Sequence, residues 1–389
     1  MITPKEFDSI RPFEPEEIPA VAERLAKNEQ FRQVIAFLYP GVPFETIIEQ
    51  IKGCKDNLDF QKKFVYGIVQ NLADKLTTGC DMDSSAIDNS GRYTFISNHR
   101  DIVLDSAFLS KLLVDNGFST TCEIAIGDNL LSLPWVKDVV RLNKAFIVER
   151  ALQMRQMLIA SKRLSEYMHF SINEKKENIW IAQRQGRAKD SNDRTQEAIL
   201  KMMVMGGEGS AIERLTALHL VPLAISYEYD PCDFLKAREM QLKRDNPDWK
   251  KSAEDDVISM KTGILGYKGN VHYQCAACID DYIKQAESLP KGEQFAAIAH
   301  KIDLDIWANY KLHKTNYIAL DIKNGNENNL GKEYSAEDKA EFNAYIDSRI
   351  AKITDVPNKD EAFMRSCILT MYAYPALNKL SKGEATFDN

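Results

Sequence analysis

The chain has 389 residues, of which 44% are hydrophobic and 28% charged, as in an ordinary globular protein rather than a disordered, collagenous or coiled-coil one. Its net charge of −7 argues against sequence-independent nucleic-acid binding, so no nucleic-acid partner is expected. We find no apolar run of about 18 residues and no basic segment followed by an apolar core at the N-terminus, so neither a membrane-spanning helix nor a secretory signal is predicted.

The first region, residues 1–88, has the pattern of a helical region. Phe60, Phe64 and Ile68 recur at every fourth position, the spacing of one helix face. The polar, Ser- and Asp-rich stretch from Gly79 to Gly91 then predicts a linker.

Short β-rich runs alternate with helical patterns over residues 89–285. This alternation predicts an α/β domain with a central, mostly parallel sheet flanked by helices. Residues 286–389 are predicted to form a C-terminal helical extension. The predicted strands are 93–97, 123–126, 145–148, 179–182 and 220–226, with 269–273 as an edge strand, and the predicted helices between them are 103–116, 151–168 and 195–205.

A histidine with nearby acids follows the first predicted strand of this domain. His99 comes directly after the strand, and Asp101 and Asp105 stand where the next helix begins. Loops at the carboxyl ends of parallel strands are where α/β sheets bind ligands. A histidine there can act as a general base when a carboxylate holds its second nitrogen. The alternative is a surface histidine with two acids that only favour the helix dipole.

Three further blocks follow in the chain, and with the His99 segment they resemble the motifs of the glycerophospholipid acyltransferases. This superfamily includes the lysophosphatidate and glycerol-3-phosphate acyltransferases. The resemblance covers roughly residues 93–235 and looks closer to the glycerol-3-phosphate branch. The blocks are Asn98 to Asp105, Gly127 to Arg150, Trp180 to Lys189 and Leu220 to Glu228.

The chain departs from the family pattern at two places. Five residues separate His99 from Asp105 where the family has four, so either a one-residue bulge brings Asp105 to His99 or Asp101 substitutes. We expect Asp105, because a small residue and an apolar helix follow it. The third block lacks the usual Glu-Gly pair and keeps Gly186-Arg187, which leaves open which hydroxyl is acylated.

The resemblance implies an O-acyltransferase. It would move a fatty acyl group from acyl carrier protein or a coenzyme A thioester to a hydroxyl of glycerol 3-phosphate or a lysophospholipid. His99 would be the general base assisted by Asp105, with no further cofactor and no metal. The implied substrate-binding residues are Arg100, Arg150, Gly186, Arg187 and Lys189, whose cationic members suit a phosphate.

Two alternative functions stay open. The first is O-acylation of an amino-acid-containing lipid, which presents a carboxylate in place of the phosphate. The second is a catalytically inactive homologue that binds a lipid or a protein partner. The basic third block could also be a solvated loop. The Cys275 and Cys278 pair, with His272 nearby, has the spacing of half a zinc site, but no second ligand pair accompanies it, and buried small side chains are expected instead.

A lipid acceptor without a spanning helix implies a peripheral protein, which we expect in the cytoplasm at the inner face of the membrane. Because a net charge of −7 does not attract anionic lipid, a local patch should supply the contact. The alternative is that these apolar residues pack onto the acyltransferase domain. The candidate patch is Phe31, Phe37, Leu38 and Tyr39 beside Lys27 and Arg32.

Overall fold

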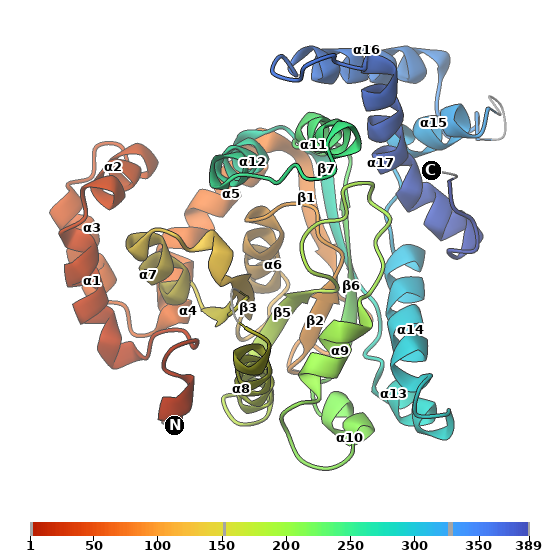
Figure 1. Ribbon diagram of the computed structural model, residues 1–389. Helices are drawn as coiled ribbons and strands as arrows, with labels where there is room; N and C mark the ends of the chain where they lie inside the picture. The colour runs from red at the N-terminus through yellow and green to blue at the C-terminus, as the bar shows by residue number, and fades with distance from the viewer. Residues whose placement is uncertain (1–2, 151–152, 326–329, 388–389) are drawn as a thin grey trace.

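A seven-stranded sheet forms the centre of the protein (Figure 1). The computed structural model describes residues 3–150, 153–325 and 330–387. The strands lie in the order β1-β7-β6-β2-β5-β3-β4, and each neighbouring pair is parallel except β6 with β7. The predicted α/β class with a mostly parallel sheet is confirmed. The strands are β1 (Thr77–Asp83), β2 (Thr94–Ser97), β3 (Cys122–Gly127), β4 (Ala145–Val148), β5 (Asn178–Ala182), β6 (Leu220–Tyr227) and β7 (Gly269–Cys275).

Two strands differ from the sequence-based expectation. Thr77–Asp83, whose polar composition predicts the start of a linker, forms the outermost strand β1. It is only half-buried, and the side chains of Cys80 and Met82 pack against the core while its polar residues alternate with them. β7 is not an edge strand as predicted, because β1 pairs with its outer side.

Helices cover both faces of the sheet. Side chains alternate across a strand, so Phe95 packs into one core cluster and its neighbour Ile96 into the other. The Phe95 cluster includes side chains of α5 and α6, and the Ile96 cluster includes those of five helices. These helices are α5 (Tyr66–Leu76) and α6 (Leu104–Asp115) on the first face, and α8 (Met154–Asn173), α9 (Glu197–Met203), α10 (Ala211–Thr216), α13 (Asp280–Gln285) and α14 (Gln294–Ala308) on the second.

The N-terminal helices build a separate apolar cluster at the β4 side of the sheet (Figure 1). Leu142 of α7 is fully buried in it, so the cluster is attached to the sheet domain through that helix. Among the described residues, no helix combines the length and apolar composition that crossing a bilayer requires. The helices are α1 (Ile18–Ala26), α2 (Glu29–Leu38), α3 (Phe44–Lys52), α4 (Asn57–Phe60) and α7 (Pro134–Leu142).

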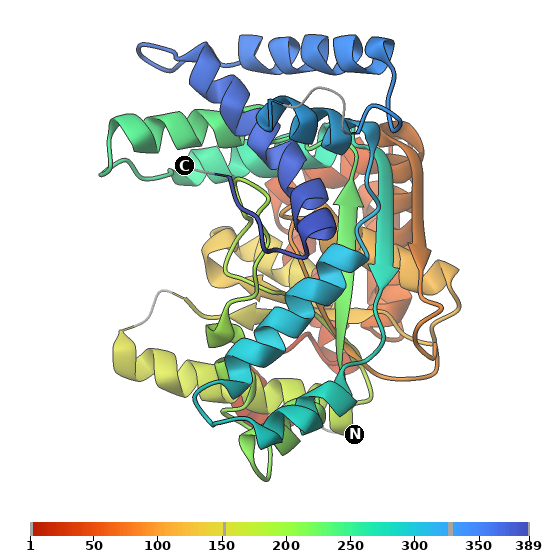
Figure 2. The ribbon, with the colours of Figure 1, turned by 90° about the vertical axis from the view of Figure 1, so that its right-hand side faces the viewer.

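The C-terminal helices pack on α11 above one end of the sheet (Figures 1 and 2). A reciprocal cap at Ser335 begins one of these helices: its hydroxyl accepts the backbone N–H of Asp338, whose carboxylate accepts the N–H of Ser335. This layer of helices covers the sheet end at which the parallel strands β2 and β6 finish. Its members are α11 (Asp233–Asp245), α12 (Ala253–Leu265), α15 (Lys314–Lys323), α16 (Ala336–Ala351) and α17 (Glu361–Ser381).

The blocks that resemble the acyltransferase motifs all meet at this end. β2, β4, β5 and β6 are parallel members of one sheet, so their carboxyl ends lie on the same edge. The edge carries the turn after Ser97, the segment after Val148, the loop after Ala182 and the segment after Tyr227. The topology therefore brings together segments that lie more than 100 residues apart in the chain.

Candidate active site

The turn after β2 is fixed to the neighbouring strand by Asn98. Its side-chain amide donates to the carbonyl of Ile225 over 2.8 Å, and its side-chain oxygen accepts the N–H of the same residue over 2.8 Å. The buried Asn98 side chain thus pairs with β6 as a peptide group would. This pairing sets the direction in which the next residue, His99, leaves the strand.

His99 and Asp105 form a hydrogen-bonded pair at this turn. His99 Nδ1 lies 2.7 Å from Asp105 Oδ2, and Asp105 is fully buried. The same carboxylate oxygen accepts the backbone N–H groups of Arg100 over 2.6 Å and Asp101 over 3.1 Å. This carboxylate oxygen therefore contacts Nδ1 of His99 and two backbone N–H groups, which leaves His99 Nε2 as the nitrogen available to a substrate.

Asp101 does not contact His99 but caps the start of α6. Its Oδ1 accepts the N–H groups of Val103 and Leu104, which are free donors at the start of α6. Burial raises the pKa of Asp101, and the nearby charge of Asp105 raises it further. The extra residue relative to the family pattern is absorbed in the turn ahead of α6. The prediction that Asp105 rather than Asp101 contacts His99 is confirmed.

Trp180 forms a wall beside the pair. Its ring meets the His99 ring edge-on with the centroids 5.6 Å apart, and its Nε1 donates to Ser97 Oγ over 3.0 Å. The side chain of His99 remains 13% exposed, so it is accessible from outside. The histidine is thus held on two sides, by a carboxylate and by an indole, and open on another.

Arg100 forms an ion pair beside the His99 turn. Its guanidinium is buried, and its Nη2 is 2.7 Å from Oδ2 of the fully buried Asp193. Tyr310 OH donates to the same carboxylate oxygen over 2.8 Å. Burial opposes the charge of Arg100, but Asp193 outweighs it and raises the pKa. The pair ties the His99 turn to the loop after β5. Arg100 Nη1 is buried without a hydrogen-bond partner in the described part of the chain, so the predicted substrate contact of Arg100 stays a prediction.

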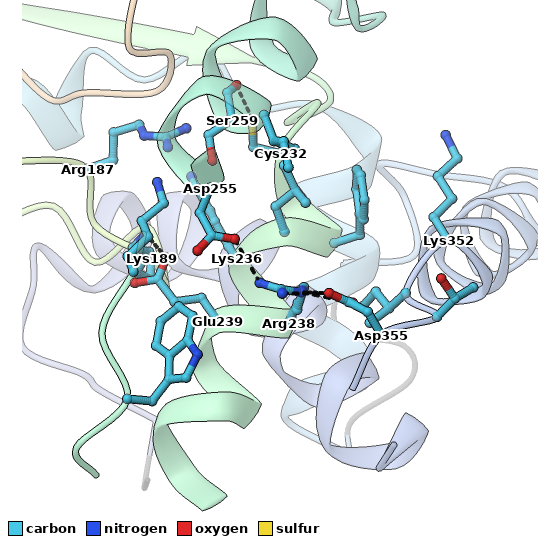
Figure 3. Close-up of a pocket in the computed structure, with 17 residues that line it drawn as sticks. Arg187, Lys189, Cys232, Lys236, Arg238, Glu239, Asp255, Ser259, Lys352 and Asp355 are labelled. Carbon is cyan, nitrogen blue, oxygen red and sulfur yellow. Dashed lines mark hydrogen bonds and ion pairs between the residues drawn. The ribbon is translucent and has the colours of Figure 1, made fainter. Parts of the chain in front are cut away.

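The loop after β5 supplies two cations to a cavity of about 230 Å³ (Figure 3). Gly186 turns this loop with φ +71°, a conformation that side chains disfavour. Arg187 and Lys189 then line the cavity, and the side chain of Lys189 pairs with Glu239 of α11. Burial lowers the pKa of Lys189 to about 8, although Glu239 raises it.

Arg187 lies close enough to the His99 turn for the charge of Asp101 to raise its pKa. Its Nη1 is buried without a hydrogen-bond partner in the part of the chain that the structure describes. Burial opposes its charge, but Cys232, Asp230 and Asp101 outweigh this and raise its pKa. A buried guanidinium N–H without an acceptor costs about 1–3 kcal/mol, so an anionic ligand here would be stabilised.

Much of the remaining cavity wall comes from α11, from α12 and from the segment after α16, none of which the sequence connects with the site. Figure 3 shows Arg238 of α11 between Asp255 of α12 and Asp355, which follows α16. Arg238 lies 2.6 Å from Asp355 and 3.3 Å from Asp255. α12 also closes over the turn itself, because a Cβ atom at Gly263 would come within 2.1 Å of Asp101 Oδ2.

Arg150 follows β4 at the same carboxyl edge of the sheet, three strands along from β2. Its backbone N–H donates to Asp128 over 3.2 Å, and its guanidinium packs so closely on Gly127 that a Cβ atom there would come within 2.8 Å. Burial lowers the pKa of Arg150, and Asp128 partly offsets this. Among the described residues, no hydrogen bond or ion pair joins Arg150 to His99, and Arg150 does not line the cavity. Its predicted substrate contact stays a prediction.

One further group has metal-ligand side chains. Among the described residues, only His219, Cys278 and Asp280 bring three such atoms within 4.8 Å of one another. His219 Nδ1 already lies 2.6 Å from Asp280 Oδ2. Cys275 and His272 do not join this group; Cys275 is buried in the sheet, and His272 Nδ1 lies 2.5 Å from Asp81.

Comparison with known proteins agrees with the resemblance. Residues 81–226 match the Acyltransferase family model, a range that includes His99, Asp105, Arg150 and Arg187. The structure of the 1-acyl-sn-glycerophosphate (LPA) acyltransferase PlsC from Thermotoga maritima matches with 10% identity and a TM-score of 0.32, over 70% of this chain and 92% of that chain. No curated protein matches the sequence. The family match over residues 81–226 agrees with the resemblance that the sequence motifs indicate.

Proposed function

We propose that this chain, an acyltransferase by its domain over residues 81–226, moves a fatty acyl group from an acyl thioester to a hydroxyl of glycerol 3-phosphate or a lysophospholipid. The donor is acyl carrier protein or coenzyme A. The observation that carries the proposal is the 2.7 Å contact between His99 Nδ1 and a buried Asp105 that two backbone N–H groups also hold. This arrangement supports general-base chemistry at Nε2.

His99 Nε2 removes the proton of the acceptor hydroxyl as its oxygen attacks the thioester carbonyl carbon. Asp105 stays ionised and stabilises the imidazolium that forms. The tetrahedral intermediate then expels the thiolate, and the imidazolium returns the proton to the sulfur. A new ester and a free thiol result. General-base contributions of this kind are about 10²–10⁴-fold.

The cavity beside the turn suits the phosphate of the acceptor. Arg187 has an unpartnered buried N–H group in the described part of the chain, and Lys189 stands two residues on. A volume of about 230 Å³ accommodates a small polyol phosphate and not a whole coenzyme A. The acyl chain of a lysophospholipid acceptor would lie outside it. A carboxylate in place of the phosphate is the alternative acceptor chemistry.

The protein would reach such an acceptor from the inner face of the membrane. Two residues of the membrane patch predicted from the sequence are not available to a membrane, so that part of the prediction is wrong. Phe31 is buried against Phe44 and Trp135, and the Tyr39 hydroxyl donates to the carbonyl of Phe64. Both belong to the N-terminal core. Arg32 is also engaged, since it pairs with Glu45 over 3.0 Å.

A product assay tests the proposal. Purified protein would receive palmitoyl-coenzyme A or palmitoyl-acyl carrier protein together with glycerol 3-phosphate, 1-acyl-glycerol 3-phosphate or a hydroxylated amino-acid lipid. Mass spectrometry would identify any ester formed. We expect an ester of a phosphate-bearing acceptor. An ester of the amino-acid lipid alone would favour the alternative acceptor, and no ester with any combination would favour an inactive homologue.

A further inference from the structure

Three exposed apolar clusters remain on the described surface after the fold has buried its core. Each lies on one helix, and large apolar side chains on a solvent-facing helix often mark a contact site. The clusters are Val34, Phe37, Leu38 and Val42 at α2, Met154, Met157, Leu158 and Ile159 on α8, and Val257, Ile258, Leu265 and Tyr267 at α12.

The three clusters differ in the net charge of the chain segments around them. The segment around the α8 cluster, residues 149–166, has a net charge of +2, whereas residues 27–45 around the α2 cluster have 0 and residues 253–267 around α12 have −2. The whole chain has −7. Arg155 stands among the apolar residues of α8 and forms no ion pair with another described residue. Only the α8 cluster therefore combines an apolar face with positive charge.

The first turns of α8 stand clear of the protein body. Residues 153–159 are all exposed, and Ala160 is the first buried residue of the helix. Met154 is 83% exposed and Leu158 59%, and with Met157 they share one face at helical spacing. Figure 2 shows this end of α8, drawn in yellow, at the outer edge of the molecule. It follows Arg150, in the second acyltransferase block, by only four residues.

We propose that the N-terminal end of α8 is the site at which this protein docks on an anionic lipid bilayer. Met154, Met157 and Leu158 enter the region between head groups and acyl chains, and Arg155 contacts the anionic head groups. The docking brings the segment after β4 to the membrane surface. The proposal rests on the proposed function for the expectation of a lipid substrate, whereas the surface itself rests on exposure and charge.

Vesicle co-sedimentation tests the docking without any substrate. Wild-type protein would be mixed with vesicles of phosphatidylglycerol and phosphatidylethanolamine, and separately with pure phosphatidylcholine. We expect binding to the anionic vesicles that weakens with added salt. The double variant Met154→Glu/Leu158→Glu should lose at least tenfold in partitioning, and Arg155→Glu about fivefold or more, since one basic residue near the surface contributes about that factor.

The matched control is Phe37→Glu, which places the same charge on the α2 cluster, where Phe37 is 76% exposed. It should bind vesicles as the wild type does. Thermal unfolding of each variant shows that the fold is retained, as expected for exposed positions. The docking site is wrong if wild-type protein does not bind anionic vesicles, if the double variant binds equally well, or if Phe37→Glu alone abolishes binding.

Activity on soluble substrates separates this proposal from the catalytic one. With glycerol 3-phosphate and a short-chain acyl-coenzyme A, the double variant should turn over within about twofold of the wild type, because His99 is untouched. Vesicle binding without turnover would refute the proposed reaction and keep the docking site. Turnover with unaltered vesicle binding by the double variant would refute the docking site alone.

Discussion

Two histidine–aspartate pairs in this protein have nearly the same length and very different surroundings. His99 Nδ1 lies 2.7 Å from Asp105, and His219 Nδ1 lies 2.6 Å from Asp280. The first pair stands at the carboxyl edge of the sheet after β2. The second stands before β6, which is parallel to β2, and so lies at the opposite edge.

The surroundings, not the distance, distinguish a reactive pair from a structural one. Asp105 is fully buried and bonded by two backbone N–H groups, whereas Asp280 is 20% exposed and His219 is 41% exposed. The hydrogen bond to Asp280 raises the pKa of His219, with Lys176 and Lys284 close enough to oppose the shift. His219 therefore joins β6 to the start of α13, while His99 stands at the carboxyl edge of the sheet, where the other blocks that resemble the family motifs also end.

The largest difference in turnover between the two pairs is expected when the aspartate of each pair is replaced by asparagine. Asp105→Asn should lower turnover by ~10²-fold or more, because the amide no longer holds the His99 tautomer or stabilises its cation. Asp280→Asn should leave turnover within about twofold. Steady-state kinetics of both variants with the best acceptor measure this, and circular dichroism checks the fold. Equal turnover of the two variants would contradict the distinction.

A smaller effect is expected at the cavity beside the first pair. Arg187→Ala should lower kcat/KM for a phosphate acceptor by about 10–100-fold, the range of a charge-assisted hydrogen bond, mainly through a higher KM. Lys352→Ala, on the far wall of the same cavity, is the comparison and should cost less. An Arg187 variant that loses activity equally with an uncharged acceptor such as glycerol would contradict phosphate binding at this residue.

The smallest effect concerns stability at the second pair. The pKa of His219 is raised in the folded protein, so its pairing stabilises the fold fully below the ordinary histidine pKa of about 6.5 and ceases to do so as the pH rises through the folded value. His219→Gln should lower the free energy of unfolding at pH 5.5 and not at pH 9. The loss should be under about 1 kcal/mol because the pair is partly exposed. Urea unfolding at both pH values checks this; a larger loss at pH 9 would contradict it.

The sequence predicted the first pair and its place because every part of that prediction is local. The strand, the turn, His99 and Asp105 fall within twelve residues, and the step from strand to helix sets their spacing. The same locality makes six of the seven described strands predictable, β7 included, although not the position of β7 in the sheet. The linker expected from Gly79 was wrong because an edge strand with one exposed face can be polar, as Thr77–Asp83 is.

The remaining parts of the site depend on contacts between distant segments. The sequence predicts a cation at Arg100 but does not show that Asp193 and Tyr310 lie beside it. These two residues lie about 90 and 210 residues further along the chain. Arg238 and Asp355 likewise meet at the cavity wall only through the packing of α11 against the C-terminal helices. No motif in one sequence records such pairings, because tertiary packing alone creates them.

The most direct test of the account compares His99→Ala with His219→Ala in one product assay, with the same acyl thioester, the same phosphate acceptor and ester formation measured by mass spectrometry. The account predicts that His99→Ala forms ester at least about 10²-fold more slowly than the wild type while remaining folded, and that His219→Ala stays within about twofold. Near-normal ester formation by His99→Ala, or an equal loss in both variants, would contradict the assignment of His99 as the general base.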